Sequence, residues 1–487
     1  MNTKLRMFGV IILCLGMTVS AWAQKPDRSA PPPLGPPPSF SMSAIQHFTL
    51  SNGVPVVLLE KHQVPLVQVN LVVRAGSVLD PPGKTGLASM MASMMMEGAG
   101  ERDALQLADA IDFLGAQVGS AAGMHTSGVS LQTPLSKLDS AIALQADVAL
   151  RPAFAPAELE RKRKSRLTTL LQWRDEPRSL ASLAFNSTLY GSAHPYGASS
   201  IGDEQAIRSL RVEDLRQFHA RYFCPDNAVL IVVGDVTAAE MKPKLERAFG
   251  AWKGTAAAGV NLPQIKQVEK RSVVLVDKPG AAQTEIRIGR IGASRITDDY
   301  YPLIVMNTIL GGSFSSRLNQ NLREQHGYTY GAGSSFSFRL LPGPFLAGAA
   351  VHTAITDSAL MEFMRELDAI QKPVPDMELE RAKNYIALGF PGEFQTVGEI
   401  AGKLEEMVIY DLADTYYSHY IGRIQAVTKA DVQRVARKYL DPAKMAIVLV
   451  GDRAAIESKI GAMNLASIAH VSIEDVLGKA PVIEGTK

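Results

Sequence analysis

Two stretches of the chain decide its architecture, because one is a variant of the other. Asp214–Asp235 reads DLRQFHARYFCPDNAVLIVVGD, and Asp431–Asp452 reads DVQRVARKYLDPAKMAIVLVGD. The aspartate, the tyrosine, the proline and the closing Gly-Asp coincide at a constant offset of 217 residues (431 minus 214). Each stretch predicts a helix, a turn at the proline and a buried strand rich in β-branched residues.

The same offset links two strand-like runs. Val56–Lys61 reads VVLLEK, and Val273–Lys278 reads VVLVDK. A period of this length is far too long for a solenoid repeat and fits the ordinary size of a domain. The sequence therefore predicts an N-terminal domain over 45–253, a linker over 254–271 and a homologous C-terminal domain over 272–487.

Both halves mix hairpin signals with long helical patterns. Ser51-Asn52-Gly53 is a turn between two runs of strand-forming residues. Further strands are predicted at 66–73, 229–233 and 446–450, and helices at 104–114, 157–173, 212–222, 301–310, 357–370, 377–387 and 429–439. The predicted fold class is α+β: two homologous domains of mostly antiparallel sheet with helices on one face.

The composition supports a large packed core and a neutral surface. Of 487 residues, 46% are hydrophobic and 20% are charged, which excludes global disorder. The net charge is +2, and removing Lys4 and Arg6 with an N-terminal signal leaves 48 basic against 48 acidic side chains. This balance argues against a nucleic-acid or membrane-surface binder.

Residues 1–23 read as a secretory signal peptide. Lys4 and Arg6 precede the short apolar run 8–19, and Ala21-Trp22-Ala23 is a small-x-small cleavage site. We expect cleavage near Ala23 and no stable membrane insertion; an uncleaved anchor is the alternative. A proline-rich linker follows over 24–44. Once Cys14 is removed, Cys224 is the only cysteine, so no intramolecular disulfide is expected.

Three further patterns have simple structural explanations. A run of methionines at 90–96 offers thioethers for copper(I), but its helical spacing also suits core packing. The basic run Arg161–Arg166 is balanced by nearby glutamates and is typical of a solvated helix face. Gly311-Gly312-Ser313 lacks the spacing and the lysine of a phosphate-binding loop.

Several motifs together resemble one peptidase family. They are Arg74-Ala75-Gly76-Ser77, Pro81-Pro82-Gly83-Lys84-Thr85-Gly86-Leu87-Ala88, His194-Pro195-Tyr196-Gly197, and Leu310–Leu318 continuing into Asn321–Glu324. With the duplicated layout, the chain from 46 to 465 resembles the insulinase/pitrilysin family of zinc metallopeptidases, which includes the mitochondrial processing peptidase. The resemblance implies an insulinase-like fold in both halves.

The resemblance also implies where the catalytic groups should be, and this chain lacks them. In catalytic relatives Gly-Leu-Ala precedes H-x-x-E-H, in which two histidines bind zinc and the glutamate acts as the base. The matching positions here are Ser89, Ala92 and Ser93, and Thr168 or Thr169 replaces the downstream ligand. No two of the nine histidines are four residues apart. No metal, cofactor or catalytic residue is therefore expected in this chain, and Glu97 is interpreted as a surface or helix-end charge.

The second half keeps a pair that catalytic relatives use on substrate. Arg323 and Tyr330 stand seven residues apart, and the resemblance implies that they reach the substrate at the zinc site. A guanidinium and a directed hydroxyl suit a peptide carbonyl or a developing oxyanion. The structural alternative is that Arg323 pairs with Glu324 and that Tyr330 lies in the core.

The resemblance implies a divided enzyme. Exported bacterial relatives include pairs in which one subunit carries the zinc and the other carries the Arg/Tyr pair. We therefore predict a periplasmic, non-catalytic, substrate-binding subunit of a heterodimer, or dimer of heterodimers, whose homologous partner supplies zinc and base to degrade peptides. Peptide would add to the sheet edge at 118–131, although 119–123 departs from the family's polar pattern. The alternatives are an inert scaffold or peptide-binding protein, and an enzyme with displaced ligands.

Overall fold

The computed structural model describes residues 35, 38–259 and 262–482. The predicted signal peptide, 1–23, lies outside the described residues, as do 24–34 and 36–37 of the predicted linker. The described residues from 38 to 482 belong to one compact unit. Within the described residues, no helix combines the length and apolar character that crossing a membrane requires.

The first half contains a six-stranded sheet in the order β1-β2-β8-β3-β7-β6. Its strands are β1 (Ile45–Thr49), β2 (Pro55–Glu60), β3 (Leu66–Val73), β6 (Gln117–Ala122), β7 (Ser127–Pro134) and β8 (Ala228–Gly234). Only β2 and β8 pair in parallel, and the other neighbours are antiparallel. All seven residues of β8 are buried, as expected for a strand covered on both faces.

The second half repeats this plan in the order β11-β12-β10-β13-β9-β14. Its strands are β9 (Ser272–Asp277), β10 (Gln283–Ile291), β11 (Gly333–Phe336), β12 (Pro344–His352), β13 (Ala446–Gly451) and β14 (Ile468–Val471). The parallel pair β13–β9 corresponds to β8–β2. The sheets differ at one edge, where β14 lies parallel to β9 and β1 lies antiparallel to β2.

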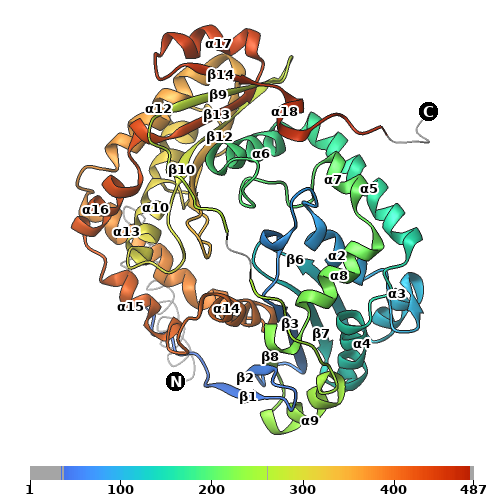
Figure 1. The fold of residues 1–487 in the computed structure, drawn as a ribbon. Coiled ribbons are helices and arrows are strands. Elements are labelled where there is room, and N and C mark those ends of the chain that lie inside the picture. Colours follow the sequence, from blue (N-terminus) through green and yellow to red (C-terminus); the bar gives the residue numbers. More distant parts are fainter. Residues whose placement is uncertain (1–34, 36–37, 260–261, 483–487) are drawn as a thin grey trace, which may run out of the picture. The chain divides into compact units, whose positions relative to one another are not determined.

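Helices flank both sheets (Figure 1). The first half has α2 (Leu87–Met95), α3 (Ala104–Phe113), α4 (Leu138–Leu150), α5 (Pro156–Asp175), α6 (Pro177–Tyr190), α7 (Glu204–Ser209), α8 (Val212–Tyr222) and α9 (Ala238–Phe249). The second half has α10 (Tyr300–Leu310), α11 (Arg317–Asn319), the π-helix η4 (Gln320–Gln325), α12 (Thr356–Ala369), α13 (Asp376–Gly389), α14 (Val397–Tyr410), α15 (Tyr420–Gln425), α16 (Lys429–Tyr439), α17 (Arg453–Ala462) and α18 (Ile473–Leu477). The predicted fold class, α+β with two similar halves of mostly antiparallel sheet, is confirmed.

The repeated residues have matching structural roles in the two halves. The carboxylates of Asp214 and Asp431 accept hydrogen bonds from the backbone N–H groups of Arg211 (2.8 Å) and Thr428 (3.1 Å), which begin α8 and α16. At the end of β8, a Cβ on Gly234 would lie 2.3 Å from the Leu66 carbonyl oxygen. The repeated aspartate thus starts a helix, and the repeated glycine lets two backbones approach.

The two halves exchange one helix each. α6 belongs to the first half but packs on β10 and β13 of the second sheet, and α14 of the second half packs on β3 and β8 (Figure 1). Shifting α6 by 217 residues gives 394–407, which overlaps α14. The exchange is therefore reciprocal between equivalent helices, and it covers the sheet face opposite each half's own helices.

The exchanged helices bury large apolar side chains. Phe185 of α6 packs in one cluster with Val274, Val448 and Val450 of the second sheet. Gly289 makes room for it, because a Cβ there would lie 2.8 Å from Cζ of the Phe185 ring. Hydrophobic burial of this kind holds the two halves together.

Candidate functional site

The helix with the degenerate zinc motif, α2, begins at a partly buried carboxylate. Asp80 accepts the backbone N–H groups of Gly86 and Ala88, each at 2.8 Å. Burial raises the pKa of Asp80 to about 6, although these hydrogen bonds and the Arg166 cation act in the opposite direction. The Asp80 carboxylate thus satisfies backbone N–H groups at the N-terminus of α2.

The residues in place of the zinc ligands are already hydrogen bonded to the backbone. Ser89 Oγ donates to the Ser200 carbonyl oxygen at 2.6 Å. Ser93 Oγ donates to the Met90 carbonyl oxygen at 2.9 Å. Ala92, at the position of the general base, is only 1% exposed and has no titratable group. These positions hold no imidazole, thiolate or carboxylate, which are the groups that bind zinc in proteins.

The position of the third ligand follows the same pattern. Thr168 and Thr169 on α5 donate their hydroxyls to the carbonyl oxygens of Lys164 (3.0 Å) and Ser165 (3.1 Å) one turn earlier. Within the described residues, no group of three or more His, Cys, Asp or Glu side chains is placed to hold a metal ion. The donor set does not fit zinc.

A partly buried cation lies beside the degenerate motif. Arg166 donates to the carbonyl oxygen of Gly86 at 3.0 Å, and Ser89 Oγ donates to the same oxygen at 3.1 Å. Burial lowers the pKa of Arg166 to about 10, so the guanidinium stays charged at neutral pH. Arg166 and Ser89 thus share one carbonyl acceptor, and the positive charge held beside it opposes a divalent cation at this place.

Much of the basic run on α5 is paired within the first half. Glu97 accepts the ammonium of Lys162 at 2.6 Å and the guanidinium of Arg161. Arg163 donates to the carbonyl oxygen of Leu210 at 2.8 Å. These contacts give Glu97 and the run a structural role in joining α5 to its neighbours.

The methionines of α2 fill the core of the first half. The four that are fully buried are Met90, Met91, Met94 and Met95. The sulfur of Met95 accepts the Ser120 hydroxyl at 3.5 Å. This placement favours core packing over copper binding, because the thioethers lie among apolar side chains.

The predicted sheet edge for peptide lies next to α2. β6 is the last strand of the first sheet and pairs only with β7. Its outer backbone groups are therefore free of a strand partner among the described residues. The second sheet ends in the corresponding edge strand, β11, which pairs only with β12. Each half thus has one edge strand, the kind of element to which extended peptides add, although Ser334 of β11 is already bonded to Gly311 and Asn307.

The motif at 194–197 joins the two halves. The Tyr196 hydroxyl is buried, accepts the backbone N–H of Leu341 at 3.2 Å and lies 2.6 Å from Nε2 of His125. Burial, together with the nearby Arg339 cation, lowers the pKa of His125 to about 4. The motif that marks the family therefore has a structural role in this chain.

Arg323 contacts neighbouring side chains, whereas Tyr330 is almost fully exposed. The Arg323 side chain lies in η4, is 37% exposed, approaches Glu324 at 3.5 Å and covers the Phe314 ring at 4.7 Å. Tyr330 is 92% exposed, so it is not a core residue. In the described part of the chain no hydrogen bond joins the two side chains. Their role in substrate binding stays a prediction.

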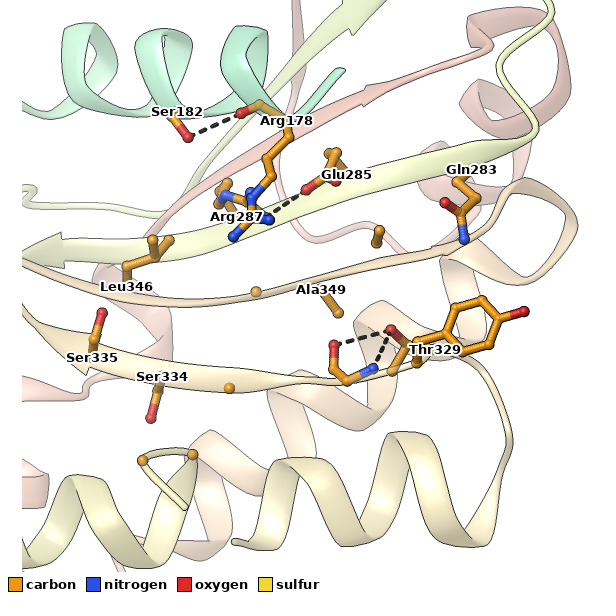
Figure 2. A pocket seen from close by; sticks show the side chains of 17 residues that line it. Arg178, Ser182, Gln283, Glu285, Arg287, Thr329, Ser334, Ser335, Leu346 and Ala349 are labelled. Atoms are coloured by element: carbon orange, nitrogen blue, oxygen red, sulfur yellow. Dashed lines mark hydrogen bonds and ion pairs between the residues drawn. The ribbon is translucent and has the colours of Figure 1, made fainter. Parts of the chain in front are cut away.

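Tyr330 lines a cavity of about 620 Å³ in the second half (Figure 2). The floor is the face of β10, β11 and β12, and one wall is the start of α6 from the first half. Its lining is Arg178, Ser182, Gln283, Glu285, Arg287, Gly311, Gly312, Thr329, Tyr330, Gly331, Gly333, Ser334, Ser335, Leu346, Gly348, Ala349 and Ala350. Glycines and small residues leave much of the backbone accessible from the cavity.

The charged residues of this cavity were not among the site residues predicted from the sequence. Glu285 and Arg287 form an ion pair of 2.7 Å, with each side chain only 10% exposed. The alternation of charged and apolar residues along β10 could have identified this pair, because it puts Glu285 and Arg287 on one face of the sheet. No local sequence pattern predicts that Arg178 of α6 lines the same cavity.

Two sheet-and-helix halves of one plan, with serine and alanine at the positions of the zinc motif, define a protein of peptidase-like fold. The model of the insulinase family (peptidase family M16) matches residues 55–201, and the model of the M16 inactive domain matches residues 209–386. The chain therefore belongs to the insulinase family, as an inactive member. The resemblance predicted from its motifs is confirmed.

The names of individual relatives include both uncharacterized zinc protease and non-peptidase homolog. The Bacillus subtilis protein named uncharacterized zinc protease YmxG is 27% identical over 287 residues, covering 59% of this chain and 68% of the relative. The Helicobacter pylori protein named non-peptidase homolog YmxG is 24% identical over 426 residues, covering 84% and 95%.

The fold is shared with solved structures. The peptidase M16 inactive domain from Pseudomonas fluorescens is 28% identical with a TM-score of 0.78, covering 84% of this chain and 98% of that one. A protease from Helicobacter pylori has the same TM-score at 21% identity, with 84% and 100% covered.

Proposed function

We propose that this protein is the non-catalytic, substrate-binding subunit of a periplasmic heterodimeric zinc metallopeptidase that degrades peptides. A homologous partner with an H-x-x-E-H motif would supply the zinc and the general base. The observation that carries the proposal is a contrast within one chain. Ser89 and Ser93 are bonded to carbonyl oxygens, whereas Tyr330 is exposed at a cavity with an accessible backbone.

Peptide binding is supported by the shape and chemistry of that cavity. β11 is the edge strand of the second sheet. The Ser334 N–H donates to the Gly311 carbonyl oxygen at 3.1 Å, and the Ser334 carbonyl oxygen accepts the Asn307 amide at 3.1 Å. A peptide strand would therefore add through main-chain hydrogen bonds to the rest of this edge. The neighbouring Gly311, Gly312 and Gly331 have no side chains to block the approach. Tyr330 adds a hydroxyl donor and an aromatic face beside this edge.

The Arg/Tyr pair gives the first test in a reconstituted complex. The tagged mature chain is purified from its own periplasm, and a co-purifying relative with H-x-x-E-H is identified by mass spectrometry. With that pair, Arg323→Ala combined with Tyr330→Phe is expected to lower kcat/KM for peptide cleavage about 100-fold, because donors to the developing oxyanion are lost.

The matched control is Arg381→Ala combined with Tyr385→Phe, two exposed side chains on α13. This variant is expected to retain full activity. Full activity of the Arg323/Tyr330 variant, or recovery of the chain without a zinc-bearing relative, would contradict the proposal.

An inert scaffold or peptide-binding protein of the same fold is the second candidate. The pairing of Arg323 with Glu324 and Phe314 favours it, because these contacts occupy the guanidinium. Under this alternative the double variant would bind its partner normally, and the complex would cleave peptides as well as before.

A further inference from the structure

The cavity beside Tyr330 contains an unbalanced set of charges. Arg287 is paired with Glu285 at 2.7 Å, and it also donates to the Ile286 carbonyl oxygen at 3.1 Å. Arg178 is exposed and forms no ion pair with a described residue. Two guanidinium groups and one carboxylate leave a net charge of +1 at neutral pH, because arginine stays protonated.

One guanidinium group comes from the wall of the cavity and the other from its floor. Figure 2 shows Arg178 extending from α6 of the first half toward Arg287 on β10 of the second half. Arg287 lies across Gly348, where an added Cβ would be 3.1 Å from its NH1 atom. Since residue 348 has no side chain, the flank of the guanidinium remains open to the cavity.

We infer that this cavity binds a carboxylate group of a bound peptide between Arg178 and Arg287. A planar guanidinium matches a carboxylate, and a charge-assisted hydrogen bond is stronger than a neutral one. The inference rests on the proposed peptide-binding function and adds a substrate class: peptides that present a carboxylate close to the segment paired with β11. The carboxylate belongs either to the peptide's C-terminus or to an acidic side chain.

The neutral groups of the cavity are consistent with this ligand. Ser182, one turn after Arg178 on α6, donates its hydroxyl to the Arg178 carbonyl oxygen at 2.9 Å. Gln283 and Ser335 add uncharged polar groups on the sheet. Glu285 is the only carboxylate in the lining, and its pairing with Arg287 reduces its repulsion of a second carboxylate.

The test measures fluorescence anisotropy of three short labelled peptides of alanine, threonine and valine. The first has a free C-terminal carboxylate, the second is amidated, and the third is amidated with one central glutamate. We expect the full chain to bind a carboxylate-bearing peptide about tenfold more tightly than the amidated neutral peptide, with a preference that falls as salt rises. The better of the first and third peptides identifies the source of the carboxylate.

Variants assign the preference to the cavity. Arg178→Gln is expected to remove the tenfold difference, and Arg178→Lys to retain most of it. Arg216→Gln, at an exposed arginine of α8, is the matched control and should behave as the parent chain. Glu285→Gln should strengthen binding of the carboxylate peptides several-fold, because Arg287 loses its internal partner; its melting temperature checks that it folds.

The outcomes separate this inference from the function on which it rests. Equal binding of all three peptides, or an unchanged preference in Arg178→Gln, overturns the carboxylate site and leaves peptide binding intact. Failure of every peptide to bind overturns the peptide-binding function and this inference with it.

Discussion

At the scale of single residues, replacing imidazole by hydroxyl changes what a helix can bind. The serines at 89 and 93 each donate to a main-chain carbonyl, so they complete the protein's own hydrogen bonding. Arg166 then places a charged guanidinium against the same backbone. The former metal position is therefore filled by internal contacts.

His125 gives a prediction that belongs to this scale. Its pKa is about 4 in the folded chain and about 6.5 when unfolded, so the unfolded state binds more protons between these values. The free energy of unfolding should therefore fall as pH drops from about 6.5 toward 4. In His125→Gln this contribution is absent, so its stability relative to the parent should improve on acidification.

Urea denaturation at pH 7 and pH 5 measures that difference. Ser182→Ala, a non-titrating exposed position, should follow the pH profile of the parent. An advantage of the parent over His125→Gln that stays constant, or grows, at pH 5 would contradict a buried neutral histidine.

At the scale of elements, the exchange of α6 and α14 explains why these helices interact with the opposite sheet. Each lies on the sheet face that the other half's own helices leave uncovered, and both sheets become buried on two faces. A central strand such as β8 is apolar at every position for this reason. In a sheet with one solvent-exposed face, apolar and polar residues alternate along each strand.

Phe185→Ala tests the exchange. The side chain is almost fully buried against the second sheet, so its removal should lower the free energy of unfolding by about 3–5 kcal/mol. Ser182→Ala, exposed on the same helix, should change it by less than about 0.5 kcal/mol. Denaturant titration measures the free energy of unfolding of both variants. Similar small decreases in the two would show that α6 contributes little to the contact between the halves.

At the scale of the whole molecule, the two halves depend on each other. Without α6, the second sheet exposes Val274, Val276, Val448 and Val450; without α14, the first exposes Val57, Leu59, Ile231 and Val233. Contiguous apolar surface of this kind drives association or aggregation.

Expressing the halves separately tests this dependence. Residues 45–253 and 272–487, each produced alone, are expected to aggregate, and co-expressed halves are expected to elute together in size-exclusion chromatography. Two soluble, separately folded monomers would contradict the role assigned to the exchanged helices.

Some features could be predicted because their causes are local. The repeated aspartate is followed by an amphipathic pattern, and it caps α8 and α16 where the pattern begins. The absence of imidazole and carboxylate at 89, 92 and 93 excludes a zinc motif there whatever the surroundings are. By contrast, 177–190 lacked a prominent periodic pattern, and α6 was not predicted.

The sequence by itself determined the duplication, the family, the loss of the zinc ligands and most of the regular elements, because these depend on motifs, caps and periodicities within short stretches. Only the tertiary structure decided that α6 and α14 change places, and that Arg178 meets the Glu285–Arg287 pair in one cavity. The physical reason is that these contacts join residues from about one hundred to more than three hundred positions apart. They follow from burying the second face of each sheet, which no short stretch of sequence encodes.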